Sequence, residues 1–205
     1  MNFISCACNA MGKNEKDYII SLWNSFLTGE ERTFSVFYDL LFEQLLNYGL
    51  HICKEQEVVE DCIQEIFVRI YLREIYPDDP SKIRAFLYKV LKNSVLNAIA
   101  RNSKTNSIDE ENMVFNLSYT IEEQLFAESD MQIRIEQLLA SLTEREKEII
   151  YLRYVHEMKI EEIAEIQGIH VQSIRNSLYR SIGKLRKENS LLMIIWFQLL
   201  IYNMD

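Results

Sequence analysis

The chain's shortage of turn-forming residues constrains its fold more than any other feature of the sequence. Five Gly and two Pro occur in 205 residues, which is roughly 3% where an average globular chain carries about 12%. A β-sandwich or barrel needs a turn about every 8–12 residues, so the sequence disfavours both. Apolar residues instead recur every three or four positions, which predicts an all-α protein with short connections between its helices.

Interruptions of this apolar spacing divide the chain into parts. Two stretches with helical spacing predict two small helical domains, and Pro77 and Pro80 break the first of them. The segment between the domains loses the periodicity and collects Ser, Thr, Asn and acidic residues, which is typical of a linker. We therefore expect an N-terminal extension without fixed structure, a first helical domain, an acidic linker, a second helical domain and an apolar C-terminal tail, at residues 1–17, 18–102, 103–120, 121–190 and 191–205.

Neither the tail nor the cysteines predict a membrane anchor, a disulfide framework or a metal site. The apolar run Leu191–Ile201 is eleven residues long, and a membrane span takes about twenty, so we expect it to pack on a domain or a partner. The four cysteines include no CxxC pair. No nucleophile–base pair or phosphate loop stands out either. We expect a cytoplasmic, non-enzymatic protein without cofactor or metal.

Basic side chains are concentrated in two places, although the formal net charge of the whole protein is −9. Residues 81–104 hold six basic and no acidic side chains, and residues 171–187 hold five basic and none acidic. Between them, residues 105–148 carry eleven acids and three bases, a local net charge of −8. Neutralising phosphate is the commonest reason to concentrate like charge. Both stretches therefore predict nucleic-acid contact rather than merely solvated helix faces.

The residues from Ile160 onward have the pattern of a helix-turn-helix. Gly168 permits the positive φ that a sharp turn between two helices requires, and Ala164 is small where the helices cross. The inward positions are apolar: Ile163, Ile169, Ile174 and Leu178. The outward positions of the second helix carry donors suited to base edges and phosphates in a major groove: Gln172, Arg175, Asn176, Tyr179 and Arg180. A plain helical hairpin with an incidentally basic face is the alternative.

These motifs resemble those of RNA polymerase σ factors of the sigma-70 superfamily, in the bacterial extracytoplasmic-function group, which has two domains called σ2 and σ4. The resemblance covers about residues 18–187. Val59–Arg69 is similar to the family's Ala-x-Asp-x-x-Gln-Glu-x-Phe helix in σ2, and Arg84–Asn93 resembles its Trp-Leu-Tyr-Arg-Ile-Ala-x-Asn segment. The σ4 part is carried by Leu142–Glu146 and Glu161–Ala164, followed by the second basic stretch.

The resemblance implies a protein that binds rather than catalyses. Its σ2 helix should dock on the clamp helices of the polymerase β′ subunit through Asp61, Gln64, Glu65 and Phe67, with Phe67 either an apolar anchor or part of the core. The σ4 domain should meet the β flap, and an anti-σ factor is a further expected partner. The runner-up is a helix-turn-helix transcriptional activator that does not replace a σ subunit.

Two sets of residues should bind promoter DNA if the resemblance holds. The first basic helix should capture the melted strand of the minus-ten element through Lys89, Lys92, Asn93 and Arg101, with Tyr76 offering a stacking face. The helix-turn-helix should read the duplex minus-thirty-five element through the five outward residues named above, together with Lys184 and, from the preceding helix, Arg153.

Overall fold

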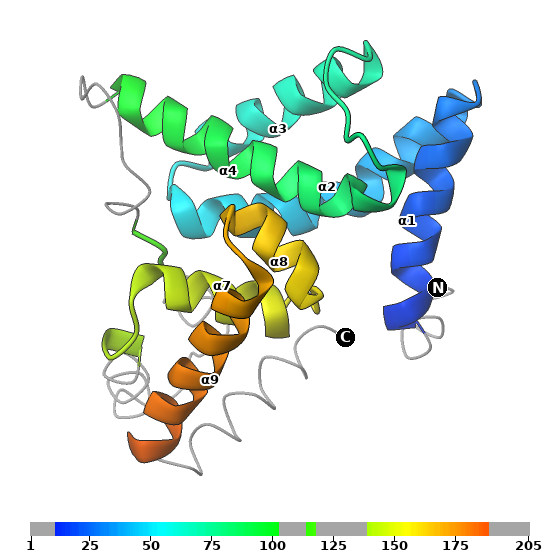
Figure 1. The fold of residues 1–205 in the computed structure, drawn as a ribbon. Coiled ribbons are helices and arrows are strands. Elements are labelled where there is room, and N and C mark those ends of the chain that lie inside the picture. Colours follow the sequence, from blue (N-terminus) through cyan, green and yellow to red (C-terminus); the bar gives the residue numbers. More distant parts are fainter. Residues whose placement is uncertain (1–10, 103–113, 118–138, 189–205) are drawn as a thin grey trace, which may run out of the picture. The chain divides into compact units, whose positions relative to one another are not determined.

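The computed structural model describes residues 11–102, 114–117 and 139–188 (Figure 1). Within the described ranges all regular structure is helical, which confirms the expected fold class. The chain forms two compact units, Met1–Asn112 and Met113–Asp205. Most of the expected linker, the start of the second domain and the apolar tail lie outside the described residues. None of the described helices is long and apolar enough to cross a lipid bilayer.

The first unit is a bundle of four helices and a short 3₁₀ turn. The elements are α1 (Met11–Leu27), α2 (Arg32–Ile52), α3 (Gln56–Tyr71), η2 (Pro80–Lys82) and α4 (Ile83–Asn102). Helix α2 packs against α1, α3 and α4, so it forms the centre of the bundle. Asp79 caps η2, because its carboxylate accepts hydrogen bonds from the backbone amide and the hydroxyl of Ser81 at 2.9 and 2.8 Å.

Aromatic rings fill one end of this bundle. Trp23 lies 5.6 Å from Phe26 and 5.7 Å from Phe37, measured between ring centroids, and all three side chains are at most 3% exposed. Phe67 of α3 joins the cluster at 5.9 Å from Phe37. Buried aromatic side chains contribute much of a small core's stability, so this cluster holds α1, α2 and α3 together.

Helix α1 begins at Met11, so seven residues that we expected to lack structure belong to it. The prediction failed because residues 12–17 are polar and show no apolar spacing. The structure supplies a polar contact instead, since the amide Nε2 of Gln44 in α2 donates to Oε1 of Glu15 at 2.8 Å.

The second unit contains a three-helix arrangement with α7 (Glu144–Tyr154), α8 (Ile160–Gln167) and α9 (Val171–Glu188). Residues 114–117, which we expected to be linker, also belong to it. Phe115 is fully buried, its ring lies 5.5 Å from that of Tyr151, and its backbone amide donates to the Glu144 carboxylate at 2.6 Å. The second unit therefore includes residues that precede its first stretch of helical apolar spacing.

Gly49 lies at a close contact between α2 and α3 that leaves no room for a side chain. A Cβ at this position would collide with Cγ1 of Val59, which is itself fully buried. In contrast, a Cβ at Gly183 in α9 would meet no atom within 4 Å.

We predict that Gly49→Ala destabilises the first unit by about 1–3 kcal/mol, because the added methyl group overpacks the α2–α3 contact. Gly183→Ala is the matched control, and it should stabilise the second unit by up to about 1 kcal/mol through its higher helix propensity. Urea denaturation followed by circular dichroism measures both. A gain in stability for Gly49→Ala would contradict the close packing described here.

Candidate nucleic-acid and protein interfaces

The predicted helix-turn-helix is formed by α8, a three-residue turn and α9. Helix α8 ends at Gly168, whose φ of 63° and ψ of 27° lie in the left-handed region. The amide of Ile169 donates to the Ala164 carbonyl at 3.1 Å, which closes the end of the helix. Arg145 of α7 supports the same end, because its guanidinium donates to the side-chain and backbone oxygens of Gln167 at 3.3 and 3.4 Å.

Helix α9 separates an apolar side from a polar side. Ile174, Leu178 and Leu185 are at most 7% exposed and lie on the side that packs against α7 and α8. The opposite side exposes all five outward residues predicted from the sequence: Gln172, Arg175, Asn176, Tyr179 and Arg180. Tyr179 is the most exposed of the large apolar side chains in the described residues, at 82%. The spacing in the sequence therefore predicted the exposed set correctly.

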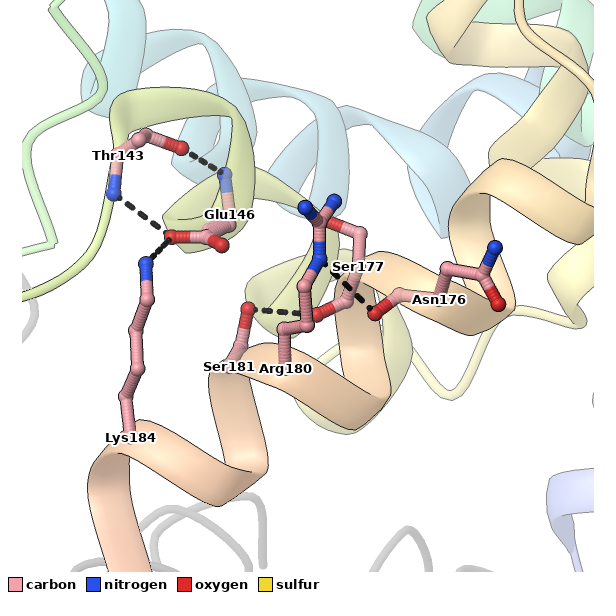
Figure 2. A network of polar contacts seen from close by, with 7 residues as sticks. All are labelled: Thr143, Glu146, Asn176, Ser177, Arg180, Ser181 and Lys184. Atoms are coloured by element: carbon pink, nitrogen blue, oxygen red, sulfur yellow. Dashed lines mark hydrogen bonds and ion pairs between the residues drawn. The ribbon is translucent and has the colours of Figure 1, made fainter. Parts of the chain in front are cut away.

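Contacts within the chain orient several of these outward side chains. The Gln172 amide donates to Oδ1 of Asn176 at 3.1 Å. Nε of Arg180 donates to the Asn176 carbonyl at 3.4 Å (Figure 2). Arg175 lies 3.5 Å from Glu161 of α8, and both side chains are more than half exposed. Glu161 was not singled out from the sequence. It occupies the outer side of α8, where an acid opposes phosphate binding.

Lys184 lies in an ion pair within the chain, although we expected it among the DNA-binding residues. Its Nζ is 2.7 Å from Oε2 of Glu146, a carboxylate that is 8% exposed (Figure 2). The same oxygen accepts from the backbone amide of Thr143 at 3.0 Å, while Oγ1 of Thr143 accepts from the Glu146 amide at 3.2 Å. This reciprocal pair is the capping box of α7. Lys184 therefore ties α9 to the first turn of α7.

Two opposing effects act on the Glu146 carboxyl. Burial alone would raise its pKa, but the hydrogen bonds from Lys184 and Thr143, with the charges of Lys184 and Arg180, together hold the pKa below its ordinary value. The carboxylate is therefore charged near neutral pH and acts as a fixed counter-ion for α9.

Arg153 also has a partner inside the second unit. Its side chain is half-buried, and Nη1 donates to the backbone carbonyl of Met158 at 2.8 Å. It braces the connection between α7 and α8.

In the first unit, α4 carries an exposed polar row. Lys89, Asn93 and Arg101 are exposed and share one side of the helix, since they follow each other at multiples of four residues. Asn97 completes the row, and its carbonyl accepts from Nε of Arg101 at 3.4 Å. The same spacing of four would have found Asn97 in the sequence. Tyr76, before η2, is 58% exposed.

Lys92 does not belong to this row, so its place among the phosphate-binding residues was wrong. It is 2% exposed, because it lies four residues from Tyr88 and Leu96 on the buried side of the helix. Tyr88 is fully buried, so its ring belongs to the core of the first unit.

Helix α3 exposes Asp61, Gln64 and Glu65 on one side. Phe67 does not join them: of the two interpretations left open, the structure confirms the core and contradicts the apolar anchor of the docking face. It is 3% exposed, and its ring lies 4.7 Å from Tyr38 and 6.0 Å from Phe34. The outer side of α3 is therefore polar in its first three turns. Among the described residues, no three His, Cys, Asp or Glu side chains are grouped closely enough to hold a metal ion.

Comparison with known proteins connects both units to one family. The family model described as Sigma-70 region 2 matches residues 37–105, and the one described as Sigma-70, region 4 matches residues 132–185. RNA polymerase sigma factor SigV of Bacillus subtilis (strain 168) is 29% identical over 65% of this chain and 76% of its own length. Two ECF RNA polymerase sigma factors of that organism, SigM and SigW, are each 22% identical to this chain. The match to SigM covers 75% of this chain and 93% of SigM, and the match to SigW covers 78% of this chain and 90% of SigW.

We predict that Lys184→Met raises the pKa of the Glu146 carboxyl, since burial then acts with less opposition. The pKa of Glu146 is depressed in the folded protein, so its contribution to stability is present at neutral pH and is lost as the pH falls through the folded pKa. The variant should lose about 1 kcal/mol at pH 7 and less at low pH. Carboxyl-carbon NMR and urea denaturation across pH measure these effects.

Lys147→Met serves as the control for this prediction, because Lys147 pairs with Glu144 at 2.7 Å in the same helix. It should leave the titration of Glu146 unchanged. An unaltered Glu146 pKa in Lys184→Met would mean that the ion pair does not hold the carboxylate in its charged form.

Proposed function

The chain belongs to the sigma-70 family, and on that premise we propose that it is a σ factor of the extracytoplasmic-function group, which binds core RNA polymerase and directs it to promoters. The first unit captures a melted strand of the minus-ten element. The second unit reads the duplex minus-thirty-five element through its helix-turn-helix. The protein acts in the bacterial cytoplasm, and an anti-σ factor regulates it.

The polar side of α9 is the observation that carries this proposal. Its five outward side chains carry amide, guanidinium and phenol groups that are exposed on the surface of the second unit. The apolar side of the same helix is buried. Amide and guanidinium groups can each form paired hydrogen bonds with base edges in a major groove. Arg175 would exchange Glu161 for DNA, at little cost because both side chains are largely exposed.

The exposed row on α4 supports the strand-capturing role of the first unit. Lys89 and Arg101 supply positive charge for phosphates, and Asn93 supplies both a donor and an acceptor for an unstacked base. Tyr76 adds an exposed ring on which a base can stack. Capture of unstacked bases favours strand opening over re-pairing of the duplex.

The outer side of α3 supports docking on the polymerase. Asp61 and Glu65 are exposed one turn apart and offer negative charge to a basic partner surface. As the family resemblance implies, we expect the β′ clamp helices to bind there and the β flap to bind the second unit.

An activator that works beside a resident σ subunit is the second candidate, because such proteins share the helix-turn-helix. In-vitro transcription separates the two. Purified chain and core polymerase should start transcription, without another σ factor, on promoters taken from the protein's own genome. Failure on all of these promoters, with rescue by another σ factor, would favour the activator.

We predict that Arg180→Ala lowers initiation from promoters with a minus-thirty-five element by roughly tenfold, through the loss of one base or phosphate contact. Affinity for the core enzyme and the melting temperature should not change, because Arg180 is exposed. Lys54→Ala removes the same charge from an exposed site in the first unit and serves as the control. Equal losses in both variants would point to a general charge effect instead of a contact.

We also predict that Asp61→Ala combined with Glu65→Ala weakens binding to core polymerase by roughly tenfold or more, because two exposed charges are removed from the docking face. Fluorescence anisotropy with labelled chain measures this affinity. The control combines Glu30→Ala with Glu31→Ala, which removes two exposed acids from the turn between α1 and α2. If both double variants bind the core enzyme like the original chain, the outer side of α3 is not the docking face.

A further inference from the structure

Arg73, just beyond the end of α3, has a backbone conformation that is unfavourable for a residue with a side chain. Its φ of 60° lies in the left-handed region, which among the described non-Gly residues is shared by Glu157 alone. In this conformation Cβ crowds the following carbonyl group, so Gly is the usual residue directly after a helix. The side chain of Arg73 should therefore make a contact that Gly could not make.

Backbone hydrogen bonds hold Arg73 in this conformation. The amide of Glu74 donates to the Arg69 carbonyl at 2.8 Å, and the amide of Arg73 donates to the Ile70 carbonyl at 3.0 Å. This pair of bonds is the Schellman motif, which ends many helices. The side chains of Arg69 and Glu74 add an ion pair at 3.6 Å. The direction in which the chain leaves α3 is therefore fixed.

The side chain of Arg73 contacts the end of α1. Its Nη2 donates to the Leu27 carbonyl at 3.5 Å, and its guanidinium lies over the ring of Phe26 at 5.7 Å from the centroid. Leu27 is the last residue of α1, where carbonyl groups lack partners within the helix and the helix dipole favours a cation. The last turn of α1 has no basic residue of its own. Arg73 supplies this cation and ties the chain beyond α3 to α1.

The loop of residues 72–79, which connects α3 to η2, is also held at its other end. Figure 1 shows it passing from the end of α3 to the start of α4, and η2 packs against both α1 and α4. Within the loop Pro77 is buried, whereas its neighbour Tyr76 is 58% exposed. The exposed ring therefore lies between two points at which the chain is attached to α1.

We propose that Arg73 is a positioning residue for strand capture, which holds the loop so that the Tyr76 ring can stack on an unstacked base of the minus-ten element. This inference rests on the proposed function, in which Tyr76 offers the stacking face. Arg73 lies three positions before Tyr76, and the fixed φ of Pro77 restricts the chain on the other side. A ring that is held before the strand arrives binds more tightly, because less conformational entropy is lost on binding.

A direct contact between Arg73 and a phosphate is the competing role, since this side chain is exposed. Two observations favour positioning. The guanidinium already contacts a carbonyl group and a ring of α1. A phosphate-binding cation also needs no left-handed backbone, because neighbouring exposed positions could carry the charge without strain.

The test is Arg73→Gly, which removes the side chain and the backbone strain together. Holoenzyme reconstituted with this variant should bind a labelled single-stranded oligonucleotide with the minus-ten sequence roughly fivefold to tenfold more weakly, as fluorescence anisotropy measures, because stacking on Tyr76 is weakened. The melting temperature and the affinity for core polymerase should stay close to those of the original chain, since the relief of strain offsets the lost contacts. Arg32→Ala, at an exposed arginine that begins α2, is the control and should bind the strand normally.

A double-mutant cycle with Tyr76→Ala separates positioning from a direct contact. If Arg73 acts through Tyr76, the double variant should bind the strand no more weakly than Tyr76→Ala alone. The salt dependence of strand binding should be the same for Arg73→Gly and the original chain, whereas loss of a phosphate contact would lower the slope by about 0.7. Additive losses or a lower slope would overturn the inference.

The outcomes distinguish this inference from the proposed function. If Arg73→Gly or Tyr76→Ala binds the strand like the original chain, and the original holoenzyme initiates transcription, the positioning role is overturned and the proposed function stands. If the original holoenzyme neither binds the strand nor initiates on any promoter, the proposed function itself fails.

Discussion

Burial of the apolar side of α9 against α7 and α8 is the constraint on which the proposed recognition of DNA depends. Ile174, Leu178 and Leu185 fix the rotation of the helix about its axis, because at 3.6 residues per turn one buried side determines which residues point outward. The left-handed Gly168 sets where α9 begins, and the pair between Lys184 and Glu146 holds it farther along. Substitutions that alter these contacts would rotate the five outward side chains of α9 away from a bound duplex.

The sequence predicts most of the fold because apolar spacing records which side of each helix is buried. It predicted the five exposed outward residues of α9, because the buried apolar positions Ile174 and Leu178 lie opposite them. It failed at Lys92 because charge was read without helix phase, although Lys92 lies on the same side as Tyr88. Phe67 was ambiguous because a large apolar residue beside acids fits a core and an interface equally well. Phe115 escaped notice because an isolated buried residue in a segment without regular structure leaves no periodic pattern.

Polar contacts between residues far apart in the chain are a second feature that the sequence could not predict. The capping box at Thr143 and Glu146 has a local sequence motif, a Thr followed three residues later by a Glu. The contact between Glu146 and Lys184 has no such motif, because Lys184 lies 38 residues farther along and meets the carboxylate only after α7 and α9 pack together. The same holds for Glu161 and Arg175. The pair with the buried Glu146 carboxylate shows how one cation of a basic helix stabilises the fold, while Arg175 and Arg180 of the same helix stay exposed.

The net charge of −9 is consistent with the proposal that the protein binds promoter DNA only as part of the polymerase complex. A negative protein repels the phosphate backbone at long range, so we expect the free chain to bind DNA poorly even with two basic helices. Under the proposed function, mounting both units on polymerase would supply the missing affinity, because contacts at two promoter elements would then become intramolecular. Footprinting on a promoter fragment tests this claim most directly. Holoenzyme reconstituted with this chain should protect both promoter elements, and the free chain at the same concentration should protect neither. Equal protection of the duplex element by the free chain would contradict the account.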